Sequence, residues 1–328
     1  MGKVLGIGNA LLDRLVQIDS GKLLGELGLA KGGMQLIDTV RYRRLQSVLD
    51  AYSTIRTTGG SACNTMKVIA RLGGKAGVIG KVGSDDEGRF FEESFRRLGV
   101  ETQLIKDTLP TGVASTFITP DGQRTFGTYL GAAARLSADE LRAEWFAGCE
   151  YFYIEGYLVQ DHALVRRATQ LAHAAGAKVC LDLASFNIVE EERDFFTGLM
   201  PEIDIVFANE YEACAFTGMD DAQANLHHLS ELCGTAVVKI GKHGVLAKRG
   251  GEEICCPARD VPRVVDTTAA GDYFSAGFLY ALQDGRGLME CVELGSLLAG
   301  HIIEVVGTSL PDEVWNKLCR YALMQGRK

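Results

Sequence analysis

The sequence predicts an α/β sandwich in which helices cover both faces of a mostly parallel central sheet, together with a small β lid. Short apolar runs alternate with longer amphipathic segments along most of the 328 residues, and this alternation is typical of parallel strands joined by helical crossovers. The short runs are apolar almost throughout, which indicates strands that are buried on both faces. Two further stretches alternate in polarity, so one of their faces lies in water or over a cleft, and they form the predicted lid.

The strands of the central sheet are expected where short runs are rich in β-branched or aromatic side chains. These runs are 3–8, 76–80, 151–154, 178–182, 204–208 and 235–240. Helices are expected between them, over 61–72, 86–98, 137–147, 162–175, 222–233, 272–283 and 288–305. No linker, low-complexity tract or internal repeat interrupts the pattern, so residues 1–328 are interpreted as one domain.

The predicted lid comes from two separate parts of the chain, at about 11–52 and 110–130. Within them, GGMQLIDTV (32–40) and GVASTFITPDGQRTFGTYL (112–130) alternate polar and apolar side chains, as half-exposed strands do. The second stretch contains Pro120-Asp121-Gly122, a turn sequence that predicts a β-hairpin.

Composition and charge exclude several classes of protein. Hydrophobic residues make up 47% of the chain and charged residues 23%, which is close to the globular average and rules out a disordered or fibrous protein. A net charge of −8 without basic clusters argues against nucleic acid as a partner. The apolar opening meets Asp13 and Arg14 early, and no run approaches the length of a membrane span, so neither a signal peptide nor a membrane protein is expected.

The nine cysteines indicate reduced thiols in a cytoplasmic protein. Their number is odd, their spacing is irregular, and no Cys-x-x-Cys pair occurs. A zinc site or a thioredoxin-like redox motif is therefore not expected, and most of the cysteines are interpreted as buried thiols.

The most informative stretch is VVDTTAAGDYFSAGFLYAL (264–282), in which a turn of small residues leads into an amphipathic helix. Small residues at a helix start let the backbone approach a ligand, and the free amides there form an anion site. Asp272 in this first turn is explained if it takes a proton from a hydroxyl that attacks a phosphoryl group, while the amides of Ala270 and Gly271 stabilise the developing charge. On spacing alone, an Asp that merely stabilises its helix dipole stays open.

Two separate motifs resemble the signatures of one kinase family. DTTAAGDYFSAGF resembles DTxGAGDxFxxGF, the C-terminal signature of the ribokinase-type (PfkB) carbohydrate and nucleoside kinases, with Ala269 in place of the commoner Gly. GGSACNTMKVIARLGGKAGVIGKVGSDDEGRFF (59–91) resembles the N-terminal signature, which is a Gly-Gly pair, an Asn, a helix and a glycine-rich strand. The resemblance extends over essentially the whole chain. It implies a ribokinase-like three-layer α/β/α fold and phosphoryl transfer from ATP to an alcohol.

The resemblance also implies roles for the residues that match the family motifs. Asp272 would be the general base, and residues 269–271 would form the anion hole. Asn209 and Glu212 in NEYEA match the family's Asn-x-x-Glu element, in which Glu212 holds Mg²⁺ through water.

A further segment, KIGKHG (239–244), resembles the family's nucleotide-binding turn. Lys239, Gly241 and Gly244 would contact ATP there, together with Thr267 from the C-terminal signature. An ordinary hairpin turn between TAVVKI and GVLAK is the alternative for this segment.

The acceptor site is expected from the first strand, the Gly-Gly loop and the lid. IGNALLD resembles the opening of adenosine kinases, and the carboxylate of Asp13 has two oxygens for two vicinal sugar hydroxyls. The alternative role for Asp13 is to cap the loop after the first strand. Gly59, Gly60 and Asn64 would bind the same sugar from the other side, and Asn9 is a weaker candidate beside Asp13.

Three more residues are expected around the base and the phosphoryl group. Tyr157 stands where adenosine kinases present an aromatic ring near the base, and Met34 on the lid would add an apolar wall. Arg124 is the lid residue expected to contact the transferred phosphoryl group, because a guanidinium bridges several phosphate oxygens. A core position for Tyr157 and a solvated turn position for Arg124 are the alternatives.

Cofactors follow from the same resemblance, which implies ATP and Mg²⁺. Asp266 and Thr268, with carbonyls from about Ile302 to Gly307, resemble the monovalent-cation loop of ribokinases. Adenosine kinases vary at this loop, so the sequence leaves K⁺ activation open.

The sequence therefore predicts a kinase that transfers the γ-phosphoryl group of ATP to the primary hydroxyl of a nucleoside, with adenosine as the first choice. A family member that acts on ribose, fructose or a related sugar is the main alternative. A non-catalytic sugar- or nucleoside-binding regulator is disfavoured by the intact Asp272, Glu212 and Gly271. A dinucleotide oxidoreductase is disfavoured because GIGNAL has Leu11 where a third Gly or Ala is needed. The sequence does not distinguish a monomer from a homodimer.

Overall fold

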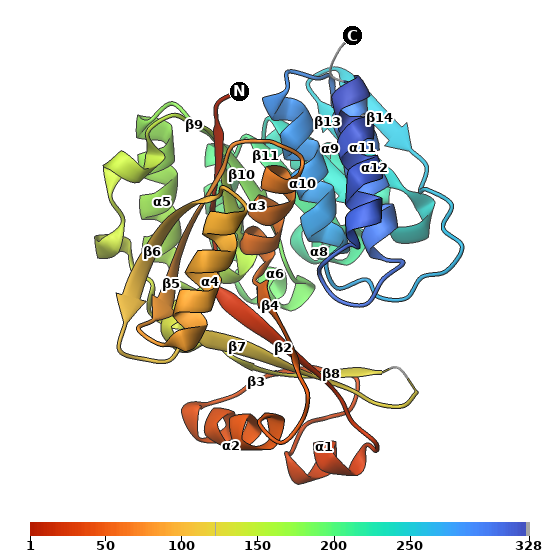
Figure 1. The fold of residues 1–328 in the computed structure, drawn as a ribbon. Helices are drawn as coiled ribbons and strands as arrows, with labels where there is room; N and C mark the ends of the chain where they lie inside the picture. Colours follow the sequence, from red (N-terminus) through yellow and green to blue (C-terminus); the bar gives the residue numbers. More distant parts are fainter. Residues whose placement is uncertain (122, 326–328) are drawn as a thin grey trace.

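The computed structural model describes residues 1–121 and 123–325, which form two sheets with helices packed around them (Figure 1). The larger sheet has the spatial order β14 (Glu252–Cys256), β13 (Val245–Arg249), β12 (Thr235–Lys239), β11 (Ile205–Asn209), β10 (Lys178–Asp182), β9 (Cys149–Glu155), β1 (Lys3–Ile7), β5 (Ala76–Gly83) and β6 (Glu101–Asp107). Pairing is parallel from β12 to β6, and β13 and β14 add an antiparallel edge. The predicted α/β sandwich with a mostly parallel sheet is confirmed.

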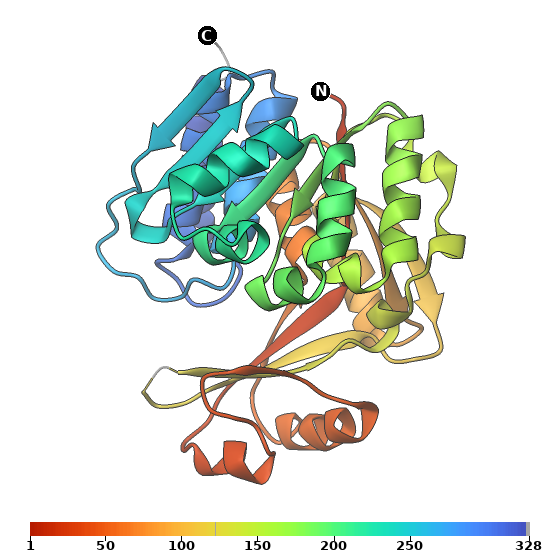
Figure 2. The same cartoon turned by 180° about the vertical axis from the view of Figure 1, so that it is seen from behind.

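Helices cover both faces of this sheet, as its apolar strands require (Figures 1 and 2). One face packs against α3 (Ser61–Arg71), α4 (Asp86–Arg97), α10 (Ala270–Gln283), α11 (Leu288–Ile302) and α12 (Asp312–Gln325). The opposite face packs against α5 (His162–Ala174), α6 (Phe186–Glu191), α7 (Arg193–Leu199), α8 (Glu210–Thr217) and α9 (Ala222–Leu232).

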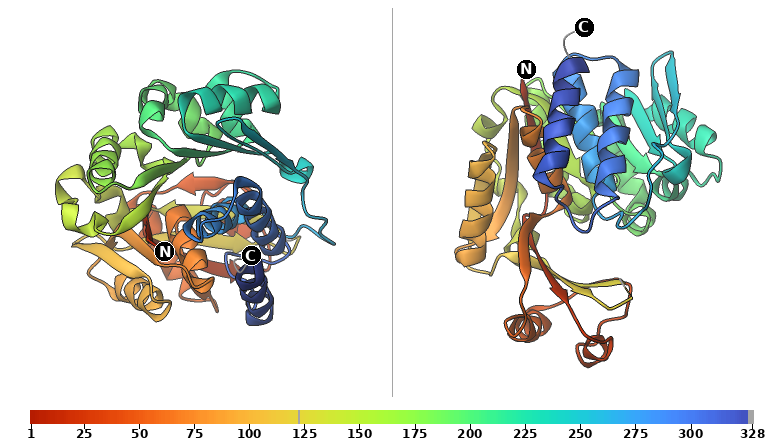
Figure 3. Two further views of the ribbon diagram at one scale, coloured as in Figure 1. Left: turned by 90° about the horizontal axis from the view of Figure 1, so that it is seen from above. Right: turned by 45° about the vertical axis from the view of Figure 1, so that its right-hand side comes forward.

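The smaller sheet lies below the main body and carries two helices on its outer side (Figure 3). Its order is β3 (Met34–Leu36), β8 (Arg124–Tyr129), β7 (Gly112–Ile118), β2 (Leu11–Gln17) and β4 (Ile55–Gly59), and its helices are α1 (Lys22–Glu26) and α2 (Thr39–Leu49). Strand β4 lies outside the predicted lid segments and connects the lid directly to α3. The predicted hairpin is formed by β7 and β8, although Gly122 at its turn lies outside the described residues.

Two predicted elements differ from the structure. Residues 137–147 do not form one helix but two short 3₁₀ turns, Ala138–Glu140 and Ala143–Phe146. The buried side chains Leu136, Leu141 and Phe146 recur every five residues, which does not match the helical period. In the lid, the predicted strand over 32–40 is only three residues long, because the Asp38 carboxylate accepts a hydrogen bond from the Arg41 amide and starts α2.

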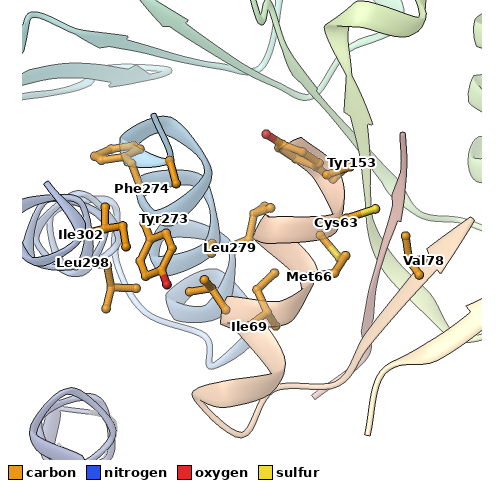
Figure 4. Close-up of a cluster of buried hydrophobic side chains, with 14 of the residues drawn as sticks. Cys63, Met66, Ile69, Val78, Tyr153, Tyr273, Phe274, Leu279, Leu298 and Ile302 are labelled. Carbon is orange, nitrogen blue, oxygen red and sulfur yellow. The ribbon is translucent and has the colours of Figure 1, made fainter. Parts of the chain in front are cut away.

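The two helices that carry the sequence motifs, α3 and α10, pack against each other in the core (Figure 4). Figure 4 shows Cys63, Met66 and Ile69 of α3 beside Tyr273 and Leu279 of α10, and all five are essentially inaccessible to solvent. Because both helices begin at the same end of the larger sheet, their first turns are brought together.

The cysteines match the sequence expectation only in part. All nine are free, but only Cys63, Cys149, Cys180 and Cys291 are buried, so most of them are not the buried thiols that were expected. Over residues 1–121 and 123–325, no helix is long and apolar enough to cross a membrane.

Gly60, between β4 and α3, tests how tightly the Gly-Gly loop is built. It has a φ of 92°, and a Cβ there would lie 2.0 Å from the carbonyl oxygen of Asn9. Gly73 has the same φ of 92°, but a Cβ there would meet nothing within 4 Å. We expect Gly73→Ala to lower the free energy of unfolding by about 1–2 kcal/mol through backbone strain alone. Gly60→Ala should cost clearly more, as measured by urea denaturation, and equal losses in the two variants would contradict the close packing of this loop.

Candidate active site

Four neighbouring parallel strands of the larger sheet end in polar side chains at the same edge. Glu155, Asp182, Asn209 and Lys239 are the last residues of β9, β10, β11 and β12, and Asn9 lies just beyond the end of β1. In open α/β sheets, ligands bind outside the carboxyl ends of the strands. The polar row therefore marks this edge as the candidate active site.

The carboxylate of Asp272 is held at this edge by the first turn of α3. Ser61 Oγ donates a hydrogen bond to Asp272 Oδ1 at 2.7 Å, and Asn64 Nδ2 donates to Oδ2 at 2.8 Å. The predicted sugar ligand Asn64 is thus bonded to the predicted base. Asn64 Oδ1 is buried and accepts no hydrogen bond from any described residue, so it keeps an acceptor for a donor that enters the site.

Burial raises the pKa of Asp272 to about 7, because a carboxylate removed from water loses its hydration. The hydrogen bonds from Asn64 and Ser61 act in the opposite direction, and repulsion from the nearby Asp182 and Glu155 adds to the increase in this pKa. A carboxylate with a pKa near neutrality is matched to general-base work at physiological pH.

The predicted anion hole lies at the start of α10. Ala269 is buried and precedes the helix, and the Ala270 amide donates to the Thr267 carbonyl at 3.1 Å. The Gly271 amide donates to no acceptor among the described residues. A Cβ on Gly271 would lie 3.4 Å from Lys239 Nζ, so an ammonium group lies directly beside this free amide.

Asn209 and Glu212 form a closed pair at the start of α8. Glu212 Oε2 accepts from the Asn209 amide at 2.7 Å and Oε1 accepts from Asn209 Nδ2 at 2.6 Å, while Asn209 Oδ1 accepts from the Glu212 amide at 2.9 Å. Burial raises the pKa of Glu212 to about 7, opposed by Lys239 and supported by Asp182. Both carboxylate oxygens are already engaged, so the pair fits a cation held through water better than one bound directly.

Asp13 lies on β2, opposite Thr57 of β4. Its carboxylate packs against Gly59, where a Cβ would lie 2.7 Å from both oxygens. Burial raises the pKa of Asp13 to about 6, and the positive charges of Lys67 and Arg124 partly oppose this. No described residue donates a hydrogen bond to Asp13, so both of its oxygens remain for donors on a ligand.

Asn9 is held in place by hydrogen bonds to the Glu155 carboxylate. Glu155 Oε1 accepts from Asn9 Nδ2 at 2.8 Å and from the Asn9 amide at 3.3 Å, and Oε2 accepts from the Ala62 amide at 3.0 Å. Glu155 is only 2% exposed. It therefore ties the loop after β1 to the start of α3.

Met34 and Tyr157, the predicted clamp for a base, are both open to solvent. Met34 is 56% exposed on β3 of the lid, and Tyr157 is 37% exposed in a 3₁₀ turn that follows β9. This exposure argues against the alternative of an ordinary core position for Tyr157.

Arg124 connects the lid to the loop before α10. Its guanidinium forms an ion pair with Asp266 Oδ2 and lies 3.5 Å from Thr268 Oγ1. Asp266 Oδ2 also accepts from the Gly307 amide at 2.8 Å, and Oδ1 accepts from Thr268 Oγ1 at 2.6 Å. Arg124 Nη2 is buried without an acceptor among the described residues, so Arg124 is a largely buried bridge and not a solvated turn residue.

The segment KIGKHG forms the turn between antiparallel strands β12 and β13. Gly241 has a φ of 55°. Gly244 has a φ of 106°, and a Cβ there would lie 2.0 Å from the Cys256 carbonyl oxygen. The hairpin is therefore present, and backbone packing is sufficient to require glycine at position 244. Contact of this turn with ATP stays a prediction.

Three residues of this site were not predicted from the sequence. Glu155 and Asp182 end strands whose apolar cores were recognised, and a carboxylate that ends a parallel strand is a usable signal for a site residue. Ser61 follows the Gly-Gly pair and gave no signal of its own, because its role depends on a partner 211 residues away.

Comparison with known proteins identifies the family. The model of the pfkB family carbohydrate kinases matches residues 29–315. The chain belongs to the PfkB family. It is therefore a phosphotransferase with an alcohol group as acceptor.

Two solved structures and one curated relative illustrate the range of this PfkB kinase's similarities. The adenosine kinase from Sinorhizobium meliloti is 35% identical, with 99% of both chains covered and a TM-score of 0.85. A probable sugar kinase from Rhizobium etli is 32% identical, with 99% of this chain and 98% of that chain covered and a TM-score of 0.86. The aminoimidazole riboside kinase of Salmonella typhimurium is 31% identical over 70% of this chain and 75% of the relative.

The pKa of Asp272 can be measured in the protein alone, by NMR titration of its side-chain carboxyl carbon. We expect a pKa of about 7 in the wild type. Asn64→Ala should raise this pKa further, because the Nδ2 hydrogen bond stabilises the carboxylate form. Asn225→Ala is the control, since Asn225 is equally buried but bonds to Thr217 in another part of the chain. A wild-type pKa near 4, or no effect of Asn64→Ala, would contradict this description of the site.

Proposed function

We propose that this PfkB kinase is an adenosine kinase, which transfers the γ-phosphoryl group of ATP to the 5′ hydroxyl of adenosine. One observation carries the proposal. Asp272 is partly buried, has a pKa near neutrality and is held by Ser61 and Asn64 beside the free amide of Gly271 and the ammonium group of Lys239. A general base, an anion site and a cation are the groups that phosphoryl transfer to an alcohol requires.

The groups of the site divide the reaction between them. Asp272 accepts the proton of the 5′ hydroxyl, whose oxygen forms the new bond to the γ-phosphorus. The bond from that phosphorus to the β,γ-bridging oxygen breaks, and ADP leaves with the electron pair. The Gly271 amide and Lys239 stabilise the charge on the transferred group, with Ala269 and Ala270 shaping the helix start. When ATP is bound, Arg124 exchanges Asp266 for a phosphate oxygen.

Nucleoside specificity is assigned to residues around Asp13. Its two free oxygens accept hydrogen bonds from the vicinal 2′ and 3′ hydroxyls. Gly59, Gly60, Asn9 and Asn64 shape the sugar site from the side of α3, and Met34 and Tyr157 close on the base from the lid and the main body. The similarity to the Sinorhizobium meliloti adenosine kinase over 99% of both chains supports a nucleoside as acceptor.

The residues that face the nucleotide come from the other end of the polar row. Asn209, Lys239, Gly241, Gly244 and Thr267 would contact ATP, and Glu212 would hold Mg²⁺ through water. When bound, Mg²⁺ neutralises charge on the phosphates. A cation near Glu212 also favours the ionised form of a carboxyl whose pKa is about 7 in its absence. The proposed partners are the acceptor and ATP, with no nucleic acid or membrane.

A monovalent cation at Asp266 would compete with the hydrogen bonds that this carboxylate already accepts. Both oxygens of Asp266 already accept hydrogen bonds, from Arg124, Thr268 and Gly307. K⁺ would therefore reach Asp266 only after Arg124 has left it, and activation by K⁺ is proposed only for the nucleotide-bound state.

A sugar kinase is kept as the second candidate function, because the probable sugar kinase from Rhizobium etli matches the chain as well as the adenosine kinase does. The two functions differ in one testable respect. A nucleoside kinase uses binding energy from the base, whereas a sugar kinase does not.

Asp272→Asn tests the role of the base. The amide has nearly the same shape but cannot take the proton, so we expect kcat to fall by about 10²–10⁴-fold. ATP affinity, measured by calorimetry, should stay within a few-fold of the wild type. Retention of more than half the wild-type kcat would overturn this assignment.

A panel of acceptors tests the substrate. With ATP and Mg²⁺, adenosine should give a higher kcat/KM than ribose or fructose, and 2′-deoxyadenosine should be poorer than adenosine because it lacks one partner of Asp13. Loss of a hydrogen-bond partner at a buried group costs about 1–3 kcal/mol. Asp13→Ala should weaken acceptor binding with little change in ATP affinity.

Asp19→Ala is the control for Asp13→Ala, since Asp19 lies just beyond the same strand and is exposed. If ribose or fructose outperforms every nucleoside, the adenosine proposal fails and the sugar-kinase candidate replaces it.

A further inference from the structure

Asp182 is a charged residue of the polar row that neither the family motifs nor the proposed reaction uses. It ends β10, between Glu155 of β9 and Asn209 of β11, and is only 6% exposed. A buried carboxylate is costly unless charge and hydrogen bonds compensate for its lost hydration. Its contacts therefore indicate what the residue is for.

The two carboxylate oxygens of Asp182 together contact three residues, which lie on β12, on α10 and in the loop after β10. Oδ2 lies 3.3 Å from Lys239 Nζ on β12 and 3.5 Å from Ser275 Oγ on α10. Oδ1 accepts from the Ala184 amide at 2.9 Å. Asp182 thus links the end of β12 to the helix that carries Asp272.

The loop after β10 is sharply bent next to this carboxylate. Ala184 has a φ of 63° and is the single residue other than glycine with positive φ in the described parts of the chain. That conformation is unfavourable for an L-residue with a Cβ. Within this turn the Ala184 amide donates to Asp182 Oδ1, and Oδ2 faces Lys239.

Lys239 is the only cation that contacts Asp182 within the described residues, and its position matters for the reaction. Its ammonium group would lie 3.4 Å from a Cβ on Gly271, which places it where the proposed anion hole needs a positive charge. Burial lowers the pKa of Lys239, but the carboxylates of Asp182, Glu212 and Asp272 outweigh burial and raise it overall. The ammonium group therefore stays charged beside Gly271.

Lys239 has a flexible four-carbon stem, and an ammonium group has no fixed direction of bonding. Contact with Asp182 restricts the side chain before any nucleotide arrives. Positioning of this kind matters in phosphoryl transfer, where catalysis is almost entirely positioning plus electrostatic stabilisation.

We propose that Asp182 is a positioning residue, which holds the Lys239 ammonium group beside the Gly271 amide so that the anion hole is assembled before ATP binds. This rests on the proposed function of the site as a phosphoryl-transfer centre. Asp182 itself touches neither the acceptor nor the transferred group. Its effect on the rate passes through Lys239.

A double-mutant cycle separates this role from a merely structural one. Lys239→Met should lower kcat by about 10²–10³-fold, as loss of a group that stabilises the transition state does. Asp182→Ala should lower kcat by about 10²-fold, as misplacement of such a group does. We expect the KM for the acceptor to change by less than about threefold in this variant. The double variant should be no slower than Lys239→Met alone, because Asp182 has nothing left to position.

Additive losses in the cycle would overturn the proposal, since Asp182 would then act independently of Lys239.

Asp204→Ala is the matched control. Asp204 precedes the neighbouring strand β11 at the opposite edge of the sheet, where its carboxylate accepts from the Val179 amide at 2.7 Å. This variant should lose stability but keep kcat. Asp182→Asn keeps the shape of the side chain and replaces Asp182→Ala in the cycle if the alanine variant does not fold.

A second measurement uses the protein without nucleotide or acceptor, so it does not depend on turnover. NMR of the lysine ammonium groups, assigned with Lys239→Met, should show a Lys239 signal protected from exchange with water in the wild type. The signal should be lost in Asp182→Ala and kept in Asp204→Ala. A Lys239 signal that is unprotected in the wild type overturns the proposal even if the enzyme is an active kinase. A protected signal in a protein without kinase activity upholds the pairing and removes only the proposed function.

Discussion

The packing of α10 against its neighbours is the constraint on which the rest of the site depends. Gly277 on α10 and Gly295 on α11 lie where the two helices touch, and a Cβ on either would come within 2.8 Å of a backbone oxygen of the other helix. On its other side, α10 packs against α3 through buried apolar side chains. These contacts hold the start of α10 close to the first turn of α3. Ser61 and Asn64 can therefore donate hydrogen bonds to Asp272.

The site accumulates acidic side chains at a cost to the fold. Burial raises the pKa values of Asp13, Glu212 and Asp272 to about 6, 7 and 7. A carboxyl whose pKa is higher in the folded than in the unfolded chain binds more protons when folded, so these three groups lower stability as the pH rises through the range between the two values. Near pH 7 these three carboxyl groups are partly ionised, although the folded protein is more stable when they are protonated. This is the expected sign of residues retained for chemistry and not for stability.

Much of the fold was predictable because the signals are local. Apolar runs such as KVCLD and TAVVK are short, β-rich and buried on both faces, and the structure has strands there. The segment 137–147 was predicted wrongly because its composition favours a helix, whereas the burial of Leu136, Leu141 and Phe146 depends on the core beneath them. Strand β4 escaped notice because IRTTG is a lid-edge strand without an apolar run.

The site was predictable only in part, for a related reason. Motifs identified Asp272, Glu212 and Lys239 as site residues, but the hydrogen bond from Ser61 and the ion pair between Arg124 and Asp266 join residues more than 140 positions apart. Asn64 was expected to bind sugar, and the structure shows it bonded to Asp272 as well. Such pairings follow from how α3 packs on α10 and how β8 reaches the loop before α10, which no single stretch of sequence encodes.

The central claim is that Asp272, at the start of α10, is the group that activates the acceptor. A crystal structure of the protein with adenosine and a non-hydrolysable ATP analogue tests it most directly. The account predicts the 5′ oxygen within hydrogen-bond reach of the Asp272 carboxylate, about 2.6–3.2 Å, and the γ-phosphate over the amide of Gly271. A nucleoside bound away from Asp272, or a γ-phosphate distant from the start of α10, would contradict it.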